Sequence, residues 1–387
     1  MRFLIGASVS LADSVVPVSV AGLPSGRQVT IQATTRSSTG VTFSSQVTFR
    51  VPASGVVDLE DMAPLSGSYS GIAAMGLLWS MQPADHPLAY ADLLPDGGQL
   101  VALSAIINGR TVATGQLTRL PAAAGVTVRN FRPKADGVYA ELFRPPPYAG
   151  RRPAVLIFGG SEGGMSGAFT AGLLASHGYP TLALAYFGEP GLPQRLARIP
   201  LEYFATALRL LASQPGVDPH RLVIQGVSRG SEAALLVGAD FPQLVHAVVA
   251  LVPSNVVLDA GSDSGHLKQP AWTLNGTGIS YQTQFGPAGG ATIPVEKING
   301  PIFMVCGGMD LIWPSCPMAQ AIAARLQQTR RPPPILLAYP YAGHGVGTLV
   351  PNIAYDDAAD LEGINPQANF PARADAWPRF LHFLATE

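Results

Sequence analysis

The stretch Gly226-Val227-Ser228-Arg229-Gly230 constrains this chain of 387 residues more than any other. An apolar run from Leu222 to Ile224 precedes it, and residues rich in Ala and Leu follow it. This pattern predicts a strand, a tight turn and a helix in direct succession. Glycines two positions before and after the serine let a strand and a helix approach closely. We therefore expect Ser228 on a strained turn, with its hydroxyl projecting beyond the end of the strand.

A serine at such a turn can act as a nucleophile. It lies at the N-terminus of the predicted helix, where backbone N–H groups stabilise developing negative charge. The alternative is a glycine-rich strand-to-helix connection whose serine has no chemical role. The strand, turn and helix context favours the nucleophile, because it is the context of the G-x-S-x-G elbow of the α/β-hydrolase fold.

Apolar segments alternate with helical ones from about residue 135 to the end of the chain. The predicted strands are 138–143, 154–158, 181–186, 221–225, 246–252, 301–306 and 335–339. The predicted helices are 168–177, 201–214, 231–239, 318–328 and 372–385. This alternation predicts a mostly parallel sheet covered by helices, and together with the elbow it predicts an α/β-hydrolase domain over 135–387.

A serine nucleophile needs a base that is oriented by an acid, and in this fold the chain order is serine, acid, histidine. Asp310 follows an apolar strand and two glycines, which suits the acid; the alternative is a helix N-cap. His344 lies in a glycine-flanked loop after the last predicted strand, which suits the general base. We predict the triad Ser228, Asp310 and His344.

The other histidines compete poorly for the role of base. His266 is the one weak competitor, because it lies in the long segment between 253 and 295, which is interpreted as a lid or mobile loop. The remaining histidines lie before turns, in a strand, in the last helix or in the N-terminal part: His86, His177, His220, His246 and His382.

The tetrahedral oxyanion needs two N–H donors. Arg229 supplies one by the logic of the fold, and Ser161, in the glycine-rich loop 159–164, is the predicted second donor. A phosphate-cradling loop is the rival interpretation, but the Gly-Lys-Ser/Thr ending of a P-loop is missing. Glu232, one turn after Ser228, is either a second acid or a residue that stabilises the start of its helix.

The N-terminal part has a different pattern. Short runs rich in Val, Thr and Phe are separated by turn signals, and Asn108-Gly109 is a strong hairpin signal. These features predict a small immunoglobulin-like β-sandwich over 1–118, with no catalytic constellation. Residues 119–134 are the predicted linker to the α/β-hydrolase domain.

Composition excludes several classes of function. The formal charge is −1 and no basic stripe occurs, so nucleic-acid binding is not expected. The two cysteines, Cys306 and Cys316, form no C-x-x-C pair, so neither a metal site nor a cofactor is expected. No apolar run reaches the length of about 20 residues that a membrane span needs, and the N-terminus resembles a strand more than a signal peptide. The cytoplasm is the expected compartment.

These residues resemble those of a known family, the type I acyl-CoA thioesterases and bile acid-CoA:amino acid N-acyltransferases, over nearly the whole length of the chain. The resemblance rests on Val18–Leu23, Met75–Ser80, Leu184–Phe187, Pro200–Phe204, Ser228–Glu232, Gly308–Asp310 with Trp313, Tyr339-Pro340, Gly343-His344 and Asp375–Trp377. It departs after His344, where aromatic and acidic residues of the family pattern are missing, and around 260–290.

The resemblance implies an acyl-CoA or other acyl thioester as substrate and the same Ser228, Asp310 and His344 triad. The expected reaction is hydrolysis to free acid and CoA, which a serine nucleophile favours over acyl transfer. Acyl transfer to an amine or alcohol, an esterase without use of CoA, and a non-catalytic binding protein are the alternatives. Arg195, Arg198 and Arg229 are candidates for CoA contacts by their charge alone. The oligomeric state stays open.

Overall fold

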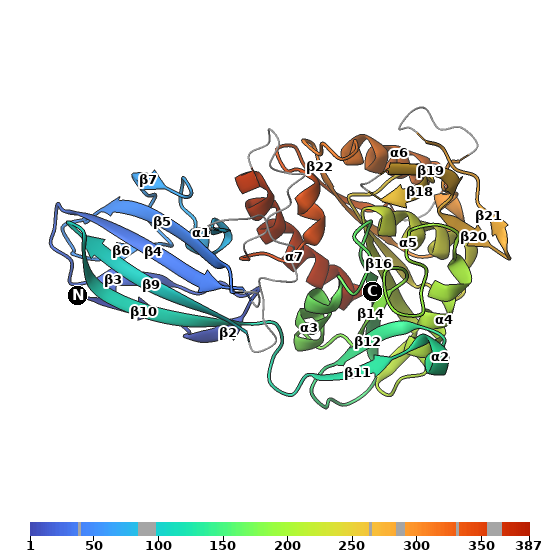
Figure 1. Ribbon diagram of the computed structural model, residues 1–387, viewed down its shortest axis with the longest axis horizontal. Coiled ribbons are helices and arrows are strands. Elements are labelled where there is room, and N and C mark those ends of the chain that lie inside the picture. Colours follow the sequence, from blue (N-terminus) through green and yellow to red (C-terminus); the bar gives the residue numbers. More distant parts are fainter. Residues whose placement is uncertain (38–39, 84–97, 263–264, 284–290, 330–332, 354–365) are drawn as a thin grey trace. The chain divides into compact units, whose positions relative to one another are not determined.

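The computed structural model describes residues 1–387 apart from 38–39, 84–97, 263–264, 284–290, 330–332 and 354–365 (Figure 1). Two compact units make up the chain. The first unit is Met1–Ala123 with Val350–Ala374, and the second is Ala124–Leu349 with Asp375–Glu387. The sequence-based boundaries had placed the returning segment Val350–Ala374 in the hydrolase domain.

The first unit is built from two sheets around one core. The first sheet has the order β1 (Arg2–Ile5), β3 (Val18–Ala21), β6 (Val57–Asp58). The second has the order β2 (Val9–Leu11), β10 (Arg110–Leu120), β9 (Gln99–Ile107), β4 (Gln28–Arg36), β5 (Thr42–Arg50), β7 (Ser66–Gly67), and β8 (Gln82–Pro83) pairs with β5. Inward-facing residues of both sheets share one apolar cluster, for example Val20 with Ile31. The predicted β-sandwich is confirmed.

Asn108-Gly109 forms the predicted hairpin turn between β9 and β10. Both residues have positive φ, 50° and 73°, as a two-residue turn of this type requires. Arg110 pairs with Ile107 directly beside the turn. A short helix, α1 (Gly76–Trp79), packs on this unit, and the Trp79 ring stacks on Phe370 of the returning segment, with ring centroids 4.6 Å apart.

Arg119 was predicted to begin the linker, but it lies inside the sandwich. Its side chain is buried and donates to Ser10 Oγ (2.7 Å) and to the carbonyl of Ala12 (2.6 Å). Burial lowers the pKa of this guanidinium to about 10. Residues 119–134 also contain a strand, β11 (Thr127–Phe131), and the start of the short helix α2 (Pro133–Asp136). The sequence pattern missed them because β11 has almost no buried face.

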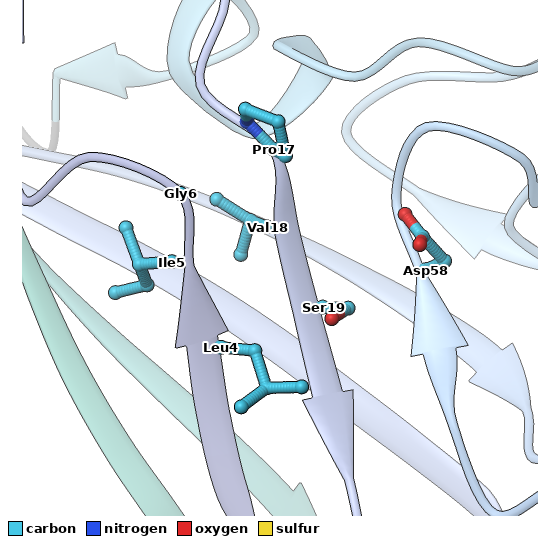
Figure 2. Close-up of a pocket in the computed structure, with 7 residues that line it drawn as sticks. All are labelled: Leu4, Ile5, Gly6, Pro17, Val18, Ser19 and Asp58. Carbon is cyan, nitrogen blue, oxygen red and sulfur yellow. The ribbon is translucent and has the colours of Figure 1, made fainter.

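A shallow hollow lies on the first unit beside β1 and β3 (Figure 2). Leu4, Ile5, Gly6, Pro17, Val18, Ser19 and Asp58 line it. In the part of this unit that the structure describes, the lining holds one carboxylate and no histidine, so it offers no acid–base pair. The hollow is therefore not a candidate catalytic site.

The second unit contains an eight-stranded sheet. Its order is β11, β12 (Tyr139–Arg144), β14 (Thr181–Ala185), β13 (Arg152–Phe158), β16 (Val217–Val227), β17 (Ala247–Leu251), β22 (Ile302–Gly307), β23 (Ile335–Tyr339). Pairing is antiparallel from β11 to β14 and parallel from β14 onward. In this sheet β14 lies before β13, although it follows β13 in the sequence, and the turn that carries Ser228 comes directly after β16. This arrangement confirms the predicted α/β-hydrolase fold.

Helices cover both faces of this sheet (Figure 1). One face shares a core with α4 (Leu201–Ala212), α5 (Arg229–Asp240) and α6 (Ser315–Gln327). The other packs against α3 (Ala168–Ser176) and the C-terminal part of α7 (Asn369–Thr386), where Phe303 contacts the Phe380 and Phe383 rings. Among the described residues, none of the helices combines the length and apolar character needed to cross a bilayer.

The long segment after β17 contains short strands that its sequence did not reveal. They are β18 (Asp259–Ser262), β19 (Gly265–Pro270), β20 (Trp272–Leu274) and β21 (Thr277–Gly278). β20 pairs with β15 (Ile199–Pro200), and the 3-10 helix Val295–Lys297 ends the segment. A pairing partner that is about 70 residues away leaves no periodic signal in so short a strand.

Candidate active site

Ser228 lies on the turn between β16 and α5, as predicted. Its backbone has φ 55° and ψ −125°, a conformation that residues with a side chain rarely adopt. The turn is fixed by the Ser228 N–H, which donates to Leu251 O (3.0 Å), and by the Ser231 hydroxyl, which donates to Ser228 O (2.6 Å). The serine is thus held at the carboxyl end of the central strand.

The two glycines of the motif are required by close packing. A Cβ at Gly226 would lie 2.2 Å from Gly230 O, and a Cβ at Gly230 would lie 2.2 Å from Gly159 O. Both distances are far below van der Waals contact, and in both cases the obstacle is backbone. The motif therefore joins three segments: β16, α5 and the loop after β13.

Asp310 and His344, predicted from separate loops, are in direct contact. The distance between His344 Nδ1 and Asp310 Oδ2 is 2.8 Å. The side chain of His344 is 9% exposed and that of Asp310 is 0% exposed, so the pair is shielded from water. Asp310 follows β22, and His344 begins a 3-10 helix, His344–Thr348, shortly after β23.

The second oxygen of Asp310 is bound by its own loop. Oδ1 accepts the backbone N–H groups of Ile312 (3.0 Å) and Trp313 (3.2 Å). These bonds orient the carboxylate so that Oδ2 faces the imidazole. The acid is thereby fixed before any substrate binds.

Trp313 connects the acid loop with the histidine and with β17. Its ring meets the His344 ring edge-on, with centroids 5.5 Å apart. Its Nε1–H donates to Val252 O (3.0 Å). Val252, just after β17, has φ 42°, which is an outlier for a β-branched residue. This strained valine turns its carbonyl toward the indole, and strain of this kind is concentrated at functional sites.

The histidine loop lies against the strand that carries the serine. A Cβ at Gly347 would be 2.8 Å from both Val227 Cγ2 and Val252 Cγ2. Val227 is the residue directly before Ser228. Because β16, β17, β22 and β23 run parallel, their carboxyl ends meet at one edge of the sheet.

The loop after β13 comes close to the serine. A Cβ at Gly160 would lie 2.8 Å from Ser228 Cβ. The Gly160 N–H donates to both carboxylate oxygens of Glu162 (2.9 and 3.0 Å). Ser161, predicted as an oxyanion donor, is the next residue in this loop. Glu162 was not singled out from the sequence, because a Glu in a glycine-rich loop carries no signal of its own.

Arg229 and Glu232 form a buried ion pair behind the nucleophile. Arg229 Nε lies 3.0 Å from Glu232 Oε1. The Arg229 guanidinium also donates to the carbonyl of Asp259 (2.9 Å), and Glu232 Oε2 accepts the indole N–H of Trp272 (3.1 Å). Burial raises the pKa of Glu232, and the nearby Arg229 partly offsets this rise.

This network corrects one expectation and adds to another. Arg229 was a candidate for contact with CoA, but its guanidinium is buried and bonded within the protein; Arg195 and Arg198 are exposed. Glu232 lies in the first turn of α5, which agrees with a residue that stabilises the start of its helix, and it also ties α5 to the segment that contains β18 and β20.

The two cysteines form a disulfide, Cys306–Cys316. It joins the end of β22 to the start of α6 and so encloses the loop that carries Asp310 and Trp313. The sequence analysis found no role for the cysteines. The one sequence feature that could have indicated the disulfide is that the two cysteines lie on either side of Asp310.

Two of the remaining histidines that the structure describes have partners outside this arrangement. His246 approaches the Glu387 carboxylate, and the His177 ring contacts Trp377. His86 and the side chain of His266 lie outside the described residues. Among the described residues, no group of three or more His, Cys, Asp or Glu side chains is placed to hold a metal ion.

Comparison with known proteins gives matches to both units. The family described as "Acyl-CoA thioester hydrolase/BAAT N-terminal region" matches residues 13–132. The family described as "BAAT / Acyl-CoA thioester hydrolase C terminal" matches residues 199–386. The second match includes Ser228, Asp310 and His344.

Two curated relatives and one solved structure illustrate the similarity. Acyl-coenzyme A thioesterase 6 of Mus musculus is 31% identical over 96% of this chain and 93% of its own length. Acyl-coenzyme A amino acid N-acyltransferase 2 of the same organism is 31% identical over 87% of this chain and 84% of its own length. A puromycin-hydrolyzing peptidase of Mycobacterium tuberculosis shares the fold, with a TM-score of 0.51 and 14% identity over 91% of this chain and 53% of that one.

Proposed function

The chain belongs to the acyl-CoA thioester hydrolase/BAAT family, and we propose that it cleaves acyl-CoA thioesters to a free acid and CoA. The acyl group passes through an ester on Ser228. The observation that carries this proposal is the buried contact between Asp310 and His344 at the sheet edge where the strained Ser228 lies.

In the first half-reaction His344 acts as general base. Nδ1–H donates to Asp310, which leaves the lone pair of Nε2 for the Ser228 proton. The serine oxygen attacks the thioester carbonyl and forms a tetrahedral oxyanion. When this intermediate collapses, the carbon–sulfur bond breaks and CoA leaves as a thiol with the proton from His344.

In the second half-reaction water replaces CoA. His344 takes a proton from the water, whose oxygen attacks the acyl-enzyme carbonyl. Collapse breaks the ester bond, the acid leaves, and Ser228 recovers its proton from His344. The backbone N–H groups of Arg229 and Ser161 stabilise both oxyanions, and such donors typically contribute about 3 kcal/mol each.

Acyl transfer to an amine is the second candidate. The N-acyltransferase relative named above favours it, since an amine would replace water in the second half-reaction. The serine nucleophile favours hydrolysis. An esterase that makes no use of CoA is the third candidate.

Thiol release from a panel of acyl-CoAs, from short to long chains, tests the proposal. Wild type and Ser228→Ala are compared, each with and without glycine or taurine, and the acyl product is identified by mass spectrometry. Release that needs Ser228 and yields free acid supports hydrolysis, and an amide product supports acyl transfer. A protein that cleaves p-nitrophenyl esters through Ser228 but releases CoA from no thioester overturns the proposal.

The cytoplasm remains the proposed compartment, and the Cys306–Cys316 disulfide provides the test. Disulfides are rare in the reducing cytosol, so the Cys306–Cys316 bond in the structure stands against this compartment. Cells are therefore lysed in an alkylating reagent, and the modified cysteines are counted by mass. Two alkylated cysteines agree with a cytoplasmic location, whereas an intact disulfide contradicts it.

A further inference from the structure

Tyr186 is buried, and its hydroxyl contacts the loop that follows β13. Tyr186 directly follows β14, the strand beside β13. Its hydroxyl donates to Gly160 O (2.7 Å) and is 3.1 Å from Gly159 O. Gly160 is also the residue that approaches Ser228. One hydroxyl therefore touches two successive peptide groups next to the nucleophile.

The tyrosine is held firmly and stays protonated. Its side chain is 3% exposed, and its ring centroid lies 5.8 Å from Phe158, 5.3 Å from Phe204 and 5.8 Å from Trp272. Burial, with a contribution from Glu162, raises the pKa of Tyr186 well above 10. The hydroxyl is thus protonated at neutral pH and can act as a donor.

These bonds fix the direction of two N–H groups. In a trans peptide the N–H points opposite to the C=O of the same plane. Since Gly159 O and Gly160 O face Tyr186, the N–H groups of Gly160 and Ser161 point to the other side. A carboxylate already lies there, because Glu162 accepts the Gly160 N–H. Glu162 thereby occupies the first N–H and leaves that of Ser161 for a substrate oxyanion.

We propose that Tyr186 is a positioning residue for the oxyanion hole: its hydroxyl holds the Gly160–Ser161 peptide so that the Ser161 N–H faces the tetrahedral intermediate on Ser228. The inference rests on the proposed function of Ser228. Tyr186 touches no substrate and acts through the peptide alone. The Tyr186 hydroxyl and the Glu162 carboxylate clamp the loop from opposite sides.

Tyr186→Phe tests the proposal, with Tyr203→Phe as the matched control. Both changes remove one hydroxyl and keep the ring. Tyr203 lies in the same unit, and the hydrogen bonds of its hydroxyl go to Ala185 O and from the Tyr139 N–H, neither of which belongs to the loop after β13. Thermal unfolding is measured for both variants, so that a loss of stability can be separated from a loss of catalysis.

Rates are measured with acyl-CoAs and with p-nitrophenyl butyrate, which needs the serine and the oxyanion hole but no CoA. Tyr186→Phe should lower kcat at least tenfold and change KM by less than twofold. Its affinity for an acyl-CoA trifluoromethyl ketone, which forms an oxyanion on the serine, should fall by the same factor as kcat. Its affinity for an acyl-CoA thioether, which forms none, should not change. Tyr203→Phe should leave all four quantities within twofold of wild type.

A Tyr186→Phe variant that keeps kcat within twofold, or that weakens the ketone and the thioether equally, overturns the inference. If wild type cleaves the ester but no acyl-CoA, the proposed function fails, while the ester rates and the rate of fluorophosphonate labelling still test Tyr186. A wild-type Ser228 that reacts with neither ester nor fluorophosphonate overturns both.

Discussion

The nucleophile and the acid–base pair are positioned by different forces. The turn at Ser228 is set by close packing, because Gly226 and Gly230 leave no room for one further atom. Asp310 and His344 are set by hydrogen bonds instead: Asp310 is bound by the backbone N–H groups of its own loop, and it is bonded in turn to His344 of a second loop. Adding one atom to a closely packed turn causes a clash and a large loss of stability. Removing one hydrogen bond from the acid–base pair costs only about 1 kcal/mol.

The largest effect on the acid–base side should come from the base itself. His344→Ala should lower kcat at least about 10³-fold with little change in stability, since triad members act as one unit. The double variant with Ser228→Ala should be no slower than either single variant. Steady-state thiol release checks both statements, and additive losses would mean that the two residues work independently.

On the nucleophile side the largest effect should be on folding. Gly230→Ala places a methyl group 2.2 Å from Gly159 O and should reduce the free energy of unfolding by about 3 kcal/mol. Gly276→Ala is the control. Its φ of 74° is unfavourable but nothing lies within 4 Å, so about 1 kcal/mol is expected. Urea unfolding measures both, and equal losses would contradict the packing argument.

A substitution at Trp313 should have a smaller effect on kcat than the loss of His344. Trp313→Phe keeps a ring beside His344 but removes the N–H that donates to Val252 O. One lost bond of about 1 kcal/mol predicts a fall in kcat of about tenfold or less. Kinetics and thermal unfolding measured together check this expectation. A loss as large as that of His344→Ala would show that the side chain has a direct chemical role.

The smallest effect should come from Glu232, which lies in α5 and pairs with Arg229, the residue after Ser228. This effect is on stability. The folded-state pKa of Glu232 is raised above its ordinary value of 4.5, mainly by burial. Ionising a group of this kind costs stability, so wild type should lose stability relative to Glu232→Gln as pH rises from below 4.5 through the raised pKa. Urea unfolding at several pH values checks the sign, and a difference that does not depend on pH would contradict it.

The same contrast explains how much the sequence could reveal. The elbow is local: strand, glycines, serine and helix are contiguous, so Ser228 and the parallel strands around it could be predicted. Asp310 and His344 could be selected because each follows a strand, although nothing local indicated that they touch. The contact between Trp313 and Val252 joins residues that are 61 positions apart, and it left no pattern in the sequence.

Residues without a motif were missed for related reasons. Tyr186 looked like the last residue of an apolar strand, since a buried hydroxyl cannot be told from a buried ring in the sequence. The Cys306–Cys316 disulfide was missed because a separation of ten residues fits no metal or redox spacing. The burial of Arg119 was missed because it depends on Ser10 and Ala12, which are more than 100 residues away in the sequence.

The central claim is that Ser228 is the nucleophile and that His344 activates it. Labelling with a fluorophosphonate, followed by peptide mapping, tests this claim most directly. We expect one label per chain, on Ser228, with none in Ser228→Ala and at least about 10²-fold slower labelling in His344→Ala. Full labelling of Ser228→Ala, or a label on another residue in wild type, would contradict it.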